Sequence, residues 1–580
     1  MLNALPFRQI WVIDFEFVAR DGEHPVVVCL VAYEIRSGQS WRIWQGDFST
    51  PPFSLEADSL FVAYSAAAEW SCFLALGWPL PARCIDLFAE FSRITNGASD
   101  AKSFPKLLHA AGHFGITAMT VDEKDVMRDL ILGGGPWSPA ERQDILHYCA
   151  ADVDVTAQLF AAMLPKLLKD SLTLGGALLR GRYTQAVARM ERNGIPIDTL
   201  TLNRLINGWE DIKLDLIREV DQRYGVYSGT QFVAARFTEW VEREGLVWPK
   251  LDSGKLSLDD DTFREQAKVH PNVADLRELR HALGKMRQNS LCVGSDGRNR
   301  TGLMPFGSKT GRNQPSNSRF IFGPSRWLRS LIKPADGRAI AYIDWSSQEI
   351  AIAAALSGDE ALWEAYSSGD PYLAFAKQAG LAPAHATKAT HKAERQRAKA
   401  IVLGVGYGMG PEAMAIQADI HIDEARELLM RHKSTYRSFW DWAERNQHAG
   451  LLGIPLQTRF GWTWQAGNGT KPNPRSLLNW PMQANGAEMM RLACCLLTEQ
   501  DIMVCCPVHD ALLVEGAVED INTVVATTQQ AMETASELVL GKGRVVKTDV
   551  EIVRYPDRYV DEAGGDLWDR VMRHLDAHGW

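Results

Sequence analysis

Hydrophobic and polar residues follow two different periods along the first 170 positions. Residues 10–33 alternate at every second position, with the turn signal "RDGEHP" between two runs, and so predict a pair of strands. Residues 138–168 instead carry apolar side chains at helical spacing, and Ser138 before Pro139 predicts where this helix begins. This region therefore predicts one α/β unit.

The pattern of the remaining chain changes from helical to mixed. Long helices are expected from 175 to about 290, followed by a loop rich in Gly, Ser, Asn, Arg and Pro at 294–326. A strand at 337–346 precedes a region dominated by helices, 359–450. The last elements are expected to be a strand pair, a helix and a strand, at 502–515, 518–540 and 545–553. The order is thus α/β, then all-α, then a β-containing domain interrupted by a helical insertion.

Length and composition limit the class of protein. A chain of 580 residues exceeds what one hydrophobic core supports, so three or four domains or subdomains are expected. It is 46% hydrophobic and 23% charged, as in globular proteins, and no stretch reaches the roughly 18 uncharged apolar residues of a membrane span. No secretory signal is recognisable and the nine cysteines form no CxxC pair, which predicts reduced thiols and a cytoplasmic location.

Net charge gives little indication of a nucleic-acid partner. The formal charge is −9, although an acidic protein can still carry a local basic groove. The stretch "KATHKAERQRAK", 388–399, is a local exception that is rich in lysine and arginine. Function therefore has to be argued from local motifs.

Two aspartates lie at the ends of apolar strands in the C-terminal region. Asp344 follows "AIAYI", and Asp510 lies at the bend of "VCCPVHDALLVEG". If these strands are neighbours, the two carboxylates converge at the rim of one sheet, and buried like charges are costly unless a cation lies between them. Such a pair suits Mg²⁺, two of which can activate a hydroxyl and stabilise a leaving oxygen. The alternative is that Asp344 caps the next helix and Asp510 is an ordinary turn residue.

A predicted helix between these aspartates carries four notable residues at a repeat of four positions. In "ERQRAKAIVLGVGYGMG" they are Arg395, Lys399, Leu403 and Tyr407. This spacing keeps them on one slowly drifting helical face, so two cations would face a polyphosphate and two apolar side chains a nucleobase. The alternative is an exposed charged helix that merges into the core.

Three segments together resemble motifs A, B and C of family A DNA polymerases, the DNA polymerase I type. They are "DWSSQEIAIAAALSGD", "RQRAKAIVLGVGYGMG" and "PVHDALLVE", in that family's order. "TGRNQPSNSRF" (310–320) is similar to the segment that leads into the family's palm, and "RSLLNWPMQANGAEMMR" (475–491) to its R-x-x-x-N-x-P-x-Q segment. The resemblance covers about residues 171–580.

This resemblance implies roles for the matched residues. Asp344 and Asp510 would bind two Mg²⁺ ions, with Mn²⁺ as an alternative, and Lys399 would also donate a proton to the leaving pyrophosphate. Glu349 would exclude a ribose 2′-hydroxyl. The implied dNTP contacts are Arg395, Lys399, Leu403, Tyr407, Glu349 and Tyr372, and the implied primer–template contacts are His509, Arg312, Arg475, Asn479 and Gln483.

Three positions depart from the family pattern. Leu403 stands where bacterial members have Phe or Tyr, and Tyr372 stands where a triphosphate-contacting His is common. Ala511 replaces the usual glutamate after the His–Asp pair, although metal binding is still expected because both aspartates are present. These departures resemble those of phage members of the family, and a chain without a 5′ nuclease module would resemble a Klenow-like core.

Acidic residues near the N-terminus form a second candidate site. Asp14 and Glu16 are two apart on a strand and share a face, as do Tyr148 and Asp152, four apart on a helix. Glu69 begins an apolar helical stretch. Taken alone, the D-x-E pair is most simply a solvated strand face. The spacing of all five residues nevertheless resembles the DnaQ-like 3′–5′ exonuclease over about residues 1–165, a domain that precedes the polymerase in this family.

The exonuclease resemblance implies two further Mg²⁺ ions. Asp14, Glu16, Glu69 and Asp152 would bind them, and Tyr148 would orient the attacking water. The family usually has Asp at the position of Glu69 and Asn at that of Ser65. The longer glutamate could shift the second ion, so the rate of hydrolysis is not predicted.

These features predict a multidomain fold of α/β and α+β type, with an RNase H-like exonuclease domain followed by a right-hand polymerase. The expected parts are an exonuclease domain (1–170), a thumb (171–300), fingers (359–479) and a palm in two segments (301–358 and 480–580). No 5′ nuclease domain is expected before residue 1.

The predicted function is DNA-templated synthesis from dNTPs on a primer, with 3′–5′ proofreading, by a monomer that replicates a phage or mobile element and has no membrane contact. Partners other than primer–template DNA and dNTPs are not predicted. The alternatives are an exonuclease whose second half only grips DNA, a catalytically inactive DNA-binding scaffold, and a host repair polymerase. Intact Asp344, Arg395, Lys399 and Asp510 favour a polymerase over the first two.

Overall fold

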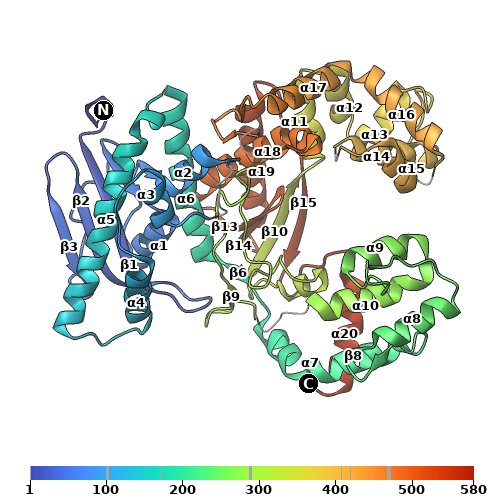
Figure 1. Ribbon diagram of the computed structural model, residues 1–580, viewed down its shortest axis with the longest axis horizontal. Helices are drawn as coiled ribbons and strands as arrows, with labels where there is room; N and C mark the ends of the chain where they lie inside the picture. The colour runs from blue at the N-terminus through green and yellow to red at the C-terminus, as the bar shows by residue number, and fades with distance from the viewer. Residues whose placement is uncertain are drawn as a thin grey trace.

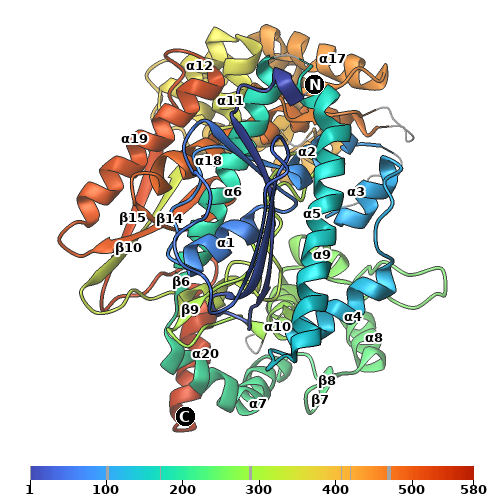
Figure 2. The same cartoon turned by 90° about the vertical axis from the view of Figure 1, so that its left-hand side faces the viewer.

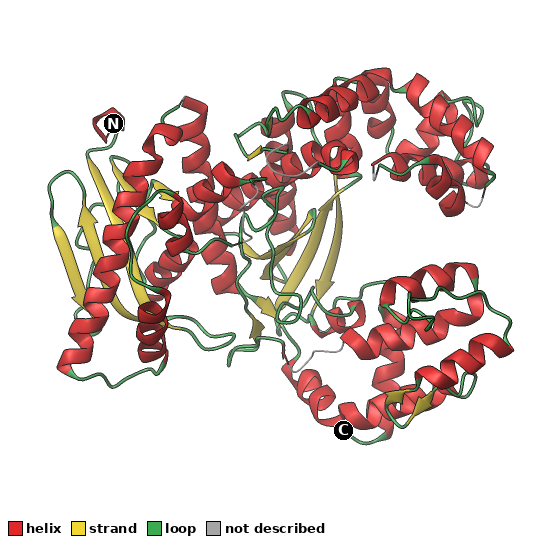
Figure 3. Ribbon diagram, viewed as in Figure 1, coloured by secondary structure: helices red, strands yellow, loops and turns green. Residues whose placement is uncertain are grey.

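Two β-sheets form the framework of the chain (Figure 1). The computed structural model describes residues 2–98, 104–169, 171–285, 290–406, 408–418, 420–466 and 472–580. One sheet has five strands and comes from the N-terminal region, whereas the other has four strands and combines segments far apart in the sequence. Figure 3 shows that helices lie next to both sheets.

The N-terminal sheet consists of β1 (Gln9–Val18), β2 (Val26–Glu34), β3 (Ser40–Trp44), β4 (Ser59–Ala63) and β5 (Cys84–Asp86), in the spatial order β3-β2-β1-β4-β5. β1 is antiparallel to β2 and parallel to β4. Helices α5 (Pro139–Leu167) and α1 (Ala67–Ala75) lie on opposite sides of this sheet, as Figure 2 shows. Since side chains alternate between faces, Val12 packs in the core that includes α5 and Ile13 in the core that includes α1.

Helix α5 begins where the sequence predicts. The Ser138 N–H donates to the Glu141 carboxylate at 2.6 Å, and the Glu141 N–H donates to the Ser138 hydroxyl at 3.3 Å, with Pro139 in the first turn. This capping box satisfies two amide groups that have no partner inside the helix. The strand pair predicted at 10–33 is also confirmed, because β1 and β2 pair there.

The second sheet is antiparallel and has the order β13-β14-β10-β15. Its strands are β10 (Arg338–Trp345), β13 (Met503–Val508), β14 (Ala511–Ala517) and β15 (Thr548–Arg554). Helices α18 (Pro474–Thr498) and α19 (Ile521–Leu540) pack against it. Strands close to those predicted at 337–346, 502–515 and 545–553 therefore form a single sheet.

Helix α6 (Ser171–Asn193) joins the two sheet regions. Its Arg180 donates to the Glu90 carboxylate at 3.1 Å and to the Phe460 carbonyl at 3.0 Å. Burial opposes the ionisation of Glu90, but Arg180 and Arg93 outweigh it and hold the pKa of this carboxyl below its usual value. A buried ion pair left without one partner is strongly destabilising, so this contact fixes the two regions to each other.

Two helical groups flank the four-stranded sheet (Figure 1). Helix α20 (Gly565–Ala577), which was not predicted from the sequence, packs on α7 (Thr199–Asp221), the first helix of one group. Trp580 follows α20, and a Cβ on Gly208 of α7 would lie 2.6 Å from the Trp580 ring. That group consists of α7 (Thr199–Asp221), α8 (Ala234–Arg243), α9 (Asp260–Val269), α10 (Ala274–Lys285) and α20 (Gly565–Ala577). The other consists of α11 (Gln348–Ser357), α12 (Glu360–Ser367), α13 (Pro371–Gln378), α14 (Lys392–Gly406), α15 (Pro411–Ala418), α16 (Ile422–Thr435) and α17 (Arg437–Leu451).

The smaller elements connect these groups. The helices are η1 (Leu2–Ala4), α2 (Leu87–Thr95), α3 (Leu107–His113), α4 (Val121–Leu132), η2 (Pro271–Val273) and η4 (Arg326–Leu331). The short strands are β6 (Ile195–Pro196), β7 (Tyr227–Ser228), β8 (Gln231–Phe232), β9 (Arg298–Asn299), β11 (Leu456–Gln457) and β12 (Thr463–Trp464). All nine cysteines are free and buried. Among the described helices, none combines the length and apolar character that a membrane crossing requires.

His432 of α16 is buried among aromatic rings. Its ring centroid lies 4.8 Å from that of Tyr436 and 5.0 Å from that of Phe375, and its Nδ1 accepts a hydrogen bond from Trp440 Nε1 at 3.1 Å. Burial lowers the pKa of His432 to about 3. The folded chain therefore keeps this imidazole neutral, whereas the unfolded chain binds a proton below its ordinary pKa of about 6.5.

The stability of helices α16 and α17 is expected to fall as the pH drops below 6.5, because only the unfolded state takes up the proton. At pH 5 the loss relative to pH 7.5 should be about 2 kcal/mol. Hydrogen exchange of peptides from 422–451, corrected for intrinsic rates, measures this loss. His432→Gln should reduce it to less than half, while the exposed control His448→Gln should leave it unchanged. Equal pH dependence in all three proteins would contradict the prediction.

Candidate active sites

Asp344 and Asp510 meet at the rim of the four-stranded sheet. Asp344 pairs with Ala511 across β10 and β14, and the Trp345 N–H donates to the Asp510 carbonyl at 3.2 Å. Burial, together with the charges of Asp510 and Asp549, raises the pKa of Asp344 to about 6. The bend between β13 and β14 therefore brings together the two carboxylates that sequence analysis had paired.

Asp549 is a third carboxylate at this rim, and sequence reasoning missed it. It lies on β15, directly opposite Asp344 in the strand register, and it also accepts a hydrogen bond from the Ser346 hydroxyl. Asp344 thus lies between Ala511 on one neighbouring strand and Asp549 on the other. No local motif signals Asp549, because its place depends on the pairing of two strands far apart in sequence.

A cavity of about 420 Å³ opens beside these carboxylates. Burial lowers the pKa of Arg312 on its wall, and the charges of Glu349 and Asp510 oppose this shift. Burial raises the pKa of Glu349, and Arg312 opposes that change in turn. The predicted residues that line the cavity are Arg312, Glu349, Tyr372, Leu403, Gln483, His509 and Asp510.

Helix α14 presents its two predicted cations to one tyrosine ring. Arg395 and Lys399 lie 5.5 Å and 5.8 Å from the centroid of Tyr372. Arg395 also donates to the Asp370 carboxylate at 2.6 Å, a partner that sequence analysis did not identify. The fourth predicted residue of this face, Tyr407, lies outside the described residues.

Helix α18 carries three predicted DNA contacts at intervals of four residues. Arg475 is exposed in its first turn, and Gln483 lines the 420 Å³ cavity. The side-chain oxygen of Asn479 between them is buried and has no hydrogen-bond partner in the described chain. Buried polar atoms normally have a partner, so this oxygen remains available to a ligand. A neighbouring cavity of about 300 Å³ includes Arg312 and His509 in its lining.

Asp14 and Glu16 form part of a second acidic group on β1. One oxygen of each lies within 4.8 Å of the other and of the Cys149 sulfur on α5. Burial, followed by the charge of Asp152, raises the pKa of Asp14 to about 8, and burial with the charge of Asp14 raises that of Glu16. One buried oxygen of Asp14, Oδ2, has no hydrogen-bond partner among the described residues.

The other predicted residues of this group come from α1 and α5. Glu69 is buried in the first turn of α1 and accepts a hydrogen bond from the Phe15 N–H at 2.8 Å. Burial and the charges of Asp14 and Glu16 raise the pKa of Glu69 well above its usual value. Burial, followed by the charge of Asp152, also raises the pKa of the Tyr148 phenol.

Lys124 is a cation within this acidic group that the sequence did not reveal. It lies on α4, and its ammonium is 2.6 Å from the Asp152 carboxylate and 5.5 Å from the Tyr148 ring centroid. The surrounding sequence, "VDEKDVMRD", is typical of a solvated helix, which is why no functional signal was apparent. Its charge opposes the effect of burial on the pKa of Asp152.

Both acidic groups suit divalent cations. Each holds carboxylates whose pKa values are raised by burial and by one another, and the unpartnered Asp14 oxygen lacks a donor in the described chain. A cation favours the ionised form of such groups and removes their repulsion. Oxygen ligands of this kind are those that Mg²⁺ and Mn²⁺ prefer.

Comparison with known proteins identifies relatives for most of the chain. The family model described as DNA polymerase family A matches residues 215–553. DNA polymerase I of Aquifex aeolicus is 24% identical over 442 residues, which cover 70% of this chain and 74% of that protein. DNA polymerase I of Chloroflexus aurantiacus is 25% identical over 417 residues, which cover 66% of this chain and 44% of the Chloroflexus protein.

A solved structure shares the fold. The POL domain of Pol1 from M. smegmatis, in complex with DNA primer-template and dNTP, has a TM-score of 0.69 and 19% sequence identity. The match covers 95% of this chain and 96% of that chain. The expected multidomain polymerase fold is thereby confirmed, whereas the individual domain boundaries stay predictions.

Lys124→Ala is expected to tighten the binding of the first Mn²⁺ ion at the N-terminal acidic group by about 3- to 10-fold, because the ammonium no longer competes for Asp152. Titration of free Mn²⁺ by electron paramagnetic resonance measures this affinity without turnover. Lys166→Ala, an exposed lysine of α5, is the control and should bind Mn²⁺ as the unaltered protein does. An unchanged or weaker affinity in Lys124→Ala would refute the competition.

Proposed function

Because the chain belongs to DNA polymerase family A, we propose that it extends the 3′ end of a primer on a DNA template, using dNTPs and two divalent metal ions. The observation that carries this proposal is the meeting of Asp344 and Asp510 at one sheet rim beside a cavity of about 420 Å³. The Aquifex relative is a DNA polymerase I, and the solved relative is a complex with DNA primer-template and dNTP.

The residues around this cavity suit the steps of nucleotide addition. Asp344 and Asp510 hold the metal ions, which when bound lower the pKa of an attacking hydroxyl and stabilise charge on the leaving oxygen. Arg395 and Lys399 grip the triphosphate, and Lys399 donates a proton to the departing pyrophosphate. Glu349 lies at the cavity wall, where it crowds a 2′-hydroxyl and favours deoxynucleotides. Catalysis of this kind rests mainly on positioning and charge.

Contacts to the substrate come from residues on several elements. Leu403 and Tyr372 line the cavity beside the nucleotide, and Tyr407, four positions after Leu403 in the sequence, is proposed as a further nucleotide contact. On the DNA side, His509 contacts the primer end. The duplex contacts are Arg312, Arg475, Asn479 and Gln483.

The N-terminal group is proposed to be a 3′–5′ exonuclease site. Asp14, Glu16, Glu69 and Asp152 hold divalent ions there, and the Tyr148 phenol orients the water that attacks the terminal phosphodiester. The convergence of these carboxylates from β1, α1 and α5 supports this reading over that of a solvated strand face. The chain would then remove a mismatched nucleotide before extending the primer.

The proposed division is an exonuclease domain (1–170), a thumb (171–300), fingers (359–479) and a palm (301–358 and 480–580). The five-stranded sheet falls within the first part, and the four-stranded sheet within the palm segments. Replication of a phage or mobile element in the cytoplasm is the proposed role. A host repair polymerase remains the alternative role.

Asp344→Ala and Asp510→Ala should each reduce primer extension by about 10³-fold or more, since either loss removes a metal ligand. Extension of a labelled primer with Mg²⁺ and dNTPs measures the rate, and binding of the same primer–template should persist. Asp557→Ala, which removes an exposed carboxylate of the palm, is the matched control. Synthesis at a normal rate in either active-site variant would refute the metal assignment, whereas primer–template binding without any synthesis by the unaltered protein would favour the DNA-binding scaffold.

Asp14→Ala should abolish removal of a mismatched 3′ nucleotide and leave extension of a matched primer within about twofold, because the two acidic groups lie on separate sheets. The assay follows a primer with a mismatched end, with Mg²⁺ and without dNTPs. The exposed control Asp47→Ala should trim at the normal rate. Normal trimming by Asp14→Ala would show that the nuclease site lies elsewhere.

A further inference from the structure

Asp549 lies beside the proposed polymerase site, on a strand that carries none of its motifs. It is directly opposite Asp344 in the antiparallel pairing of β15 with β10. Side chains of directly opposed residues project from the same face of a sheet, with Cβ atoms about 4.5–5.5 Å apart. Ala511 of β14 is directly opposite Asp344 on the other side, and Asp510 precedes Ala511. Three carboxylates therefore gather around the end of one strand.

No cation of the protein neutralises these three carboxylates. In the part of the chain that the structure describes, Asp344, Asp510 and Asp549 form no ion pair with a lysine, an arginine or a histidine. The N-terminal acidic group differs, because Lys124 Nζ lies 2.6 Å from the Asp152 carboxylate there. Like charges placed directly opposite each other destabilise a sheet, and a nearby cation removes this repulsion.

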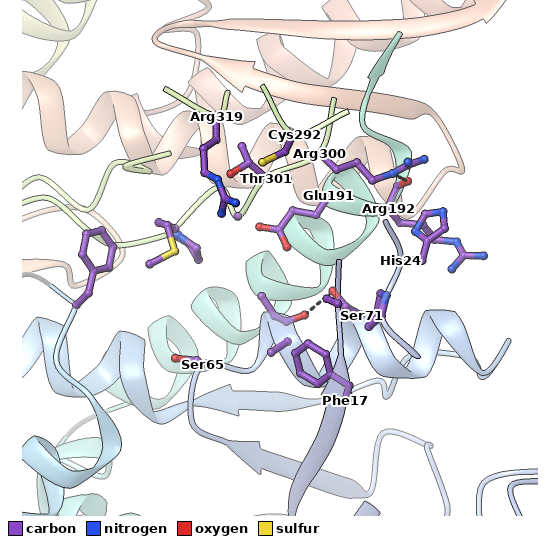
Figure 4. A pocket seen from close by; sticks show the side chains of 18 of the residues that line it. Phe17, His24, Ser65, Ser71, Glu191, Arg192, Cys292, Arg300, Thr301 and Arg319 are labelled. Atoms are coloured by element: carbon purple, nitrogen blue, oxygen red, sulfur yellow. Dashed lines mark hydrogen bonds between the residues drawn. The ribbon is translucent and has the colours of Figure 1, made fainter. Parts of the chain in front are cut away.

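A lone buried acid elsewhere in the chain avoids this cost by binding a proton. Glu191, in the wall of a cavity of about 740 Å³ (Figure 4), accepts a hydrogen bond from the Leu303 N–H at 2.7 Å. Burial raises the pKa of Glu191 to about 7, without a contribution from another acid. One proton neutralises such a group, but it does not neutralise three carboxylates. A divalent ion compensates two charges at once and so suits the rim better than a proton does.

Strand β15 also holds the turn that leads from Asp344 to the helix of Glu349. The Ser346 hydroxyl donates to Asp549 Oδ2, and the Ser346 N–H donates to the Lys547 carbonyl at 2.9 Å. The other oxygen of Asp549, Oδ1, has no hydrogen bond to a residue that the structure describes, and the side chain is exposed. Mg²⁺ usually keeps several waters, through which a carboxylate outside its direct ligands can act on the ion.

We propose that Asp549 is a positioning residue of the polymerase site, whose carboxylate strengthens the binding of the divalent ions held by Asp344 and Asp510. This role rests on the proposed polymerase function and deepens it, because the site gains a third acid from a strand outside its motifs. Asp549 supplies a charge on one flank of Asp344, whereas Ala511 supplies none on the other.

The first test measures Mn²⁺ affinity without turnover, by electron paramagnetic resonance of the free ion. Asp14→Ala protein is the background, because it lacks a ligand of the N-terminal group, and the bound ions lost on adding Asp344→Ala are those of the rim. Asp549→Asn should weaken binding of the rim ions by about 10-fold, since it removes one charge at nearly constant side-chain size. Asp557→Asn, an exposed carboxylate of the same C-terminal segment, is the control and should leave the affinity unchanged. Unchanged rim affinity in Asp549→Asn would overturn the proposal.

Two further variants separate the charge of Asp549 from its hydrogen bond. Ser346→Ala removes the donor and keeps the carboxylate, so the affinity for Mn²⁺ should stay within about twofold of the unaltered protein. Asp549→Glu keeps the charge and should bind Mn²⁺ more tightly than Asp549→Asn does. A loss in Ser346→Ala as large as that in Asp549→Asn would show that Asp549 only shapes the turn, which would contradict the proposed role of its charge.

Primer extension separates this proposal from the polymerase function itself. Asp549→Asn should raise the Mg²⁺ concentration for half-maximal rate by about 10-fold, with kcat at saturating Mg²⁺ within about threefold of the unaltered protein. Asp344→Ala should not recover at any Mg²⁺ concentration. Normal synthesis with the same Mg²⁺ requirement in Asp549→Asn would leave the polymerase standing and refute the role of Asp549. Absence of synthesis by the unaltered protein, with no bound Mn²⁺ that depends on Asp344, would refute both.

Discussion

Mutual repulsion among carboxylates is the constraint on which both acidic groups depend. At the rim of the four-stranded sheet, Asp344 is half-buried and lies beside Asp510 and Asp549, and its pKa rises to about 6. In the N-terminal group, burial and neighbouring acids raise the pKa values of Asp14, Glu16 and Glu69. Such groups are stable as anions only when a cation lies among them, so their scaffold must hold them together against this repulsion.

Both scaffolds meet that demand with strands anchored in a hydrophobic core. β10 lies between two partner strands, so Asp344 has Ala511 of β14 opposite it on one side and Asp549 of β15 on the other, and β1 likewise pairs with both β2 and β4. Helix α6 then fixes one scaffold to the other through the buried pair of Arg180 and Glu90. A close-packed joint of this kind keeps the two scaffolds at a constant separation.

The sequence allowed the local features of this arrangement to be predicted. The capping box of Ser138 and Glu141 and the strand that carries Asp344 depend on neighbours within a few residues. Lys124, Asp549 and the packing of Trp580 on Gly208 were not predicted. Each depends on contacts between elements more than 25 residues apart, for which the periodicity of one segment carries no information.

The position of Asp549 bears on one departure from the family pattern, the absence of an acid directly after Asp510. The resemblance to family A led to an acid being expected after Asp510, yet Ala511 is there, directly opposite Asp344 on β14. Asp549 is directly opposite Asp344 on the other neighbouring strand, β15. The effect of a neighbouring charge on the pKa of Asp344 depends on how far away and how buried that charge is, whichever strand carries it. The rim therefore has three carboxylates without an acid at position 511, and the loss of a motif residue does not imply the loss of its negative charge.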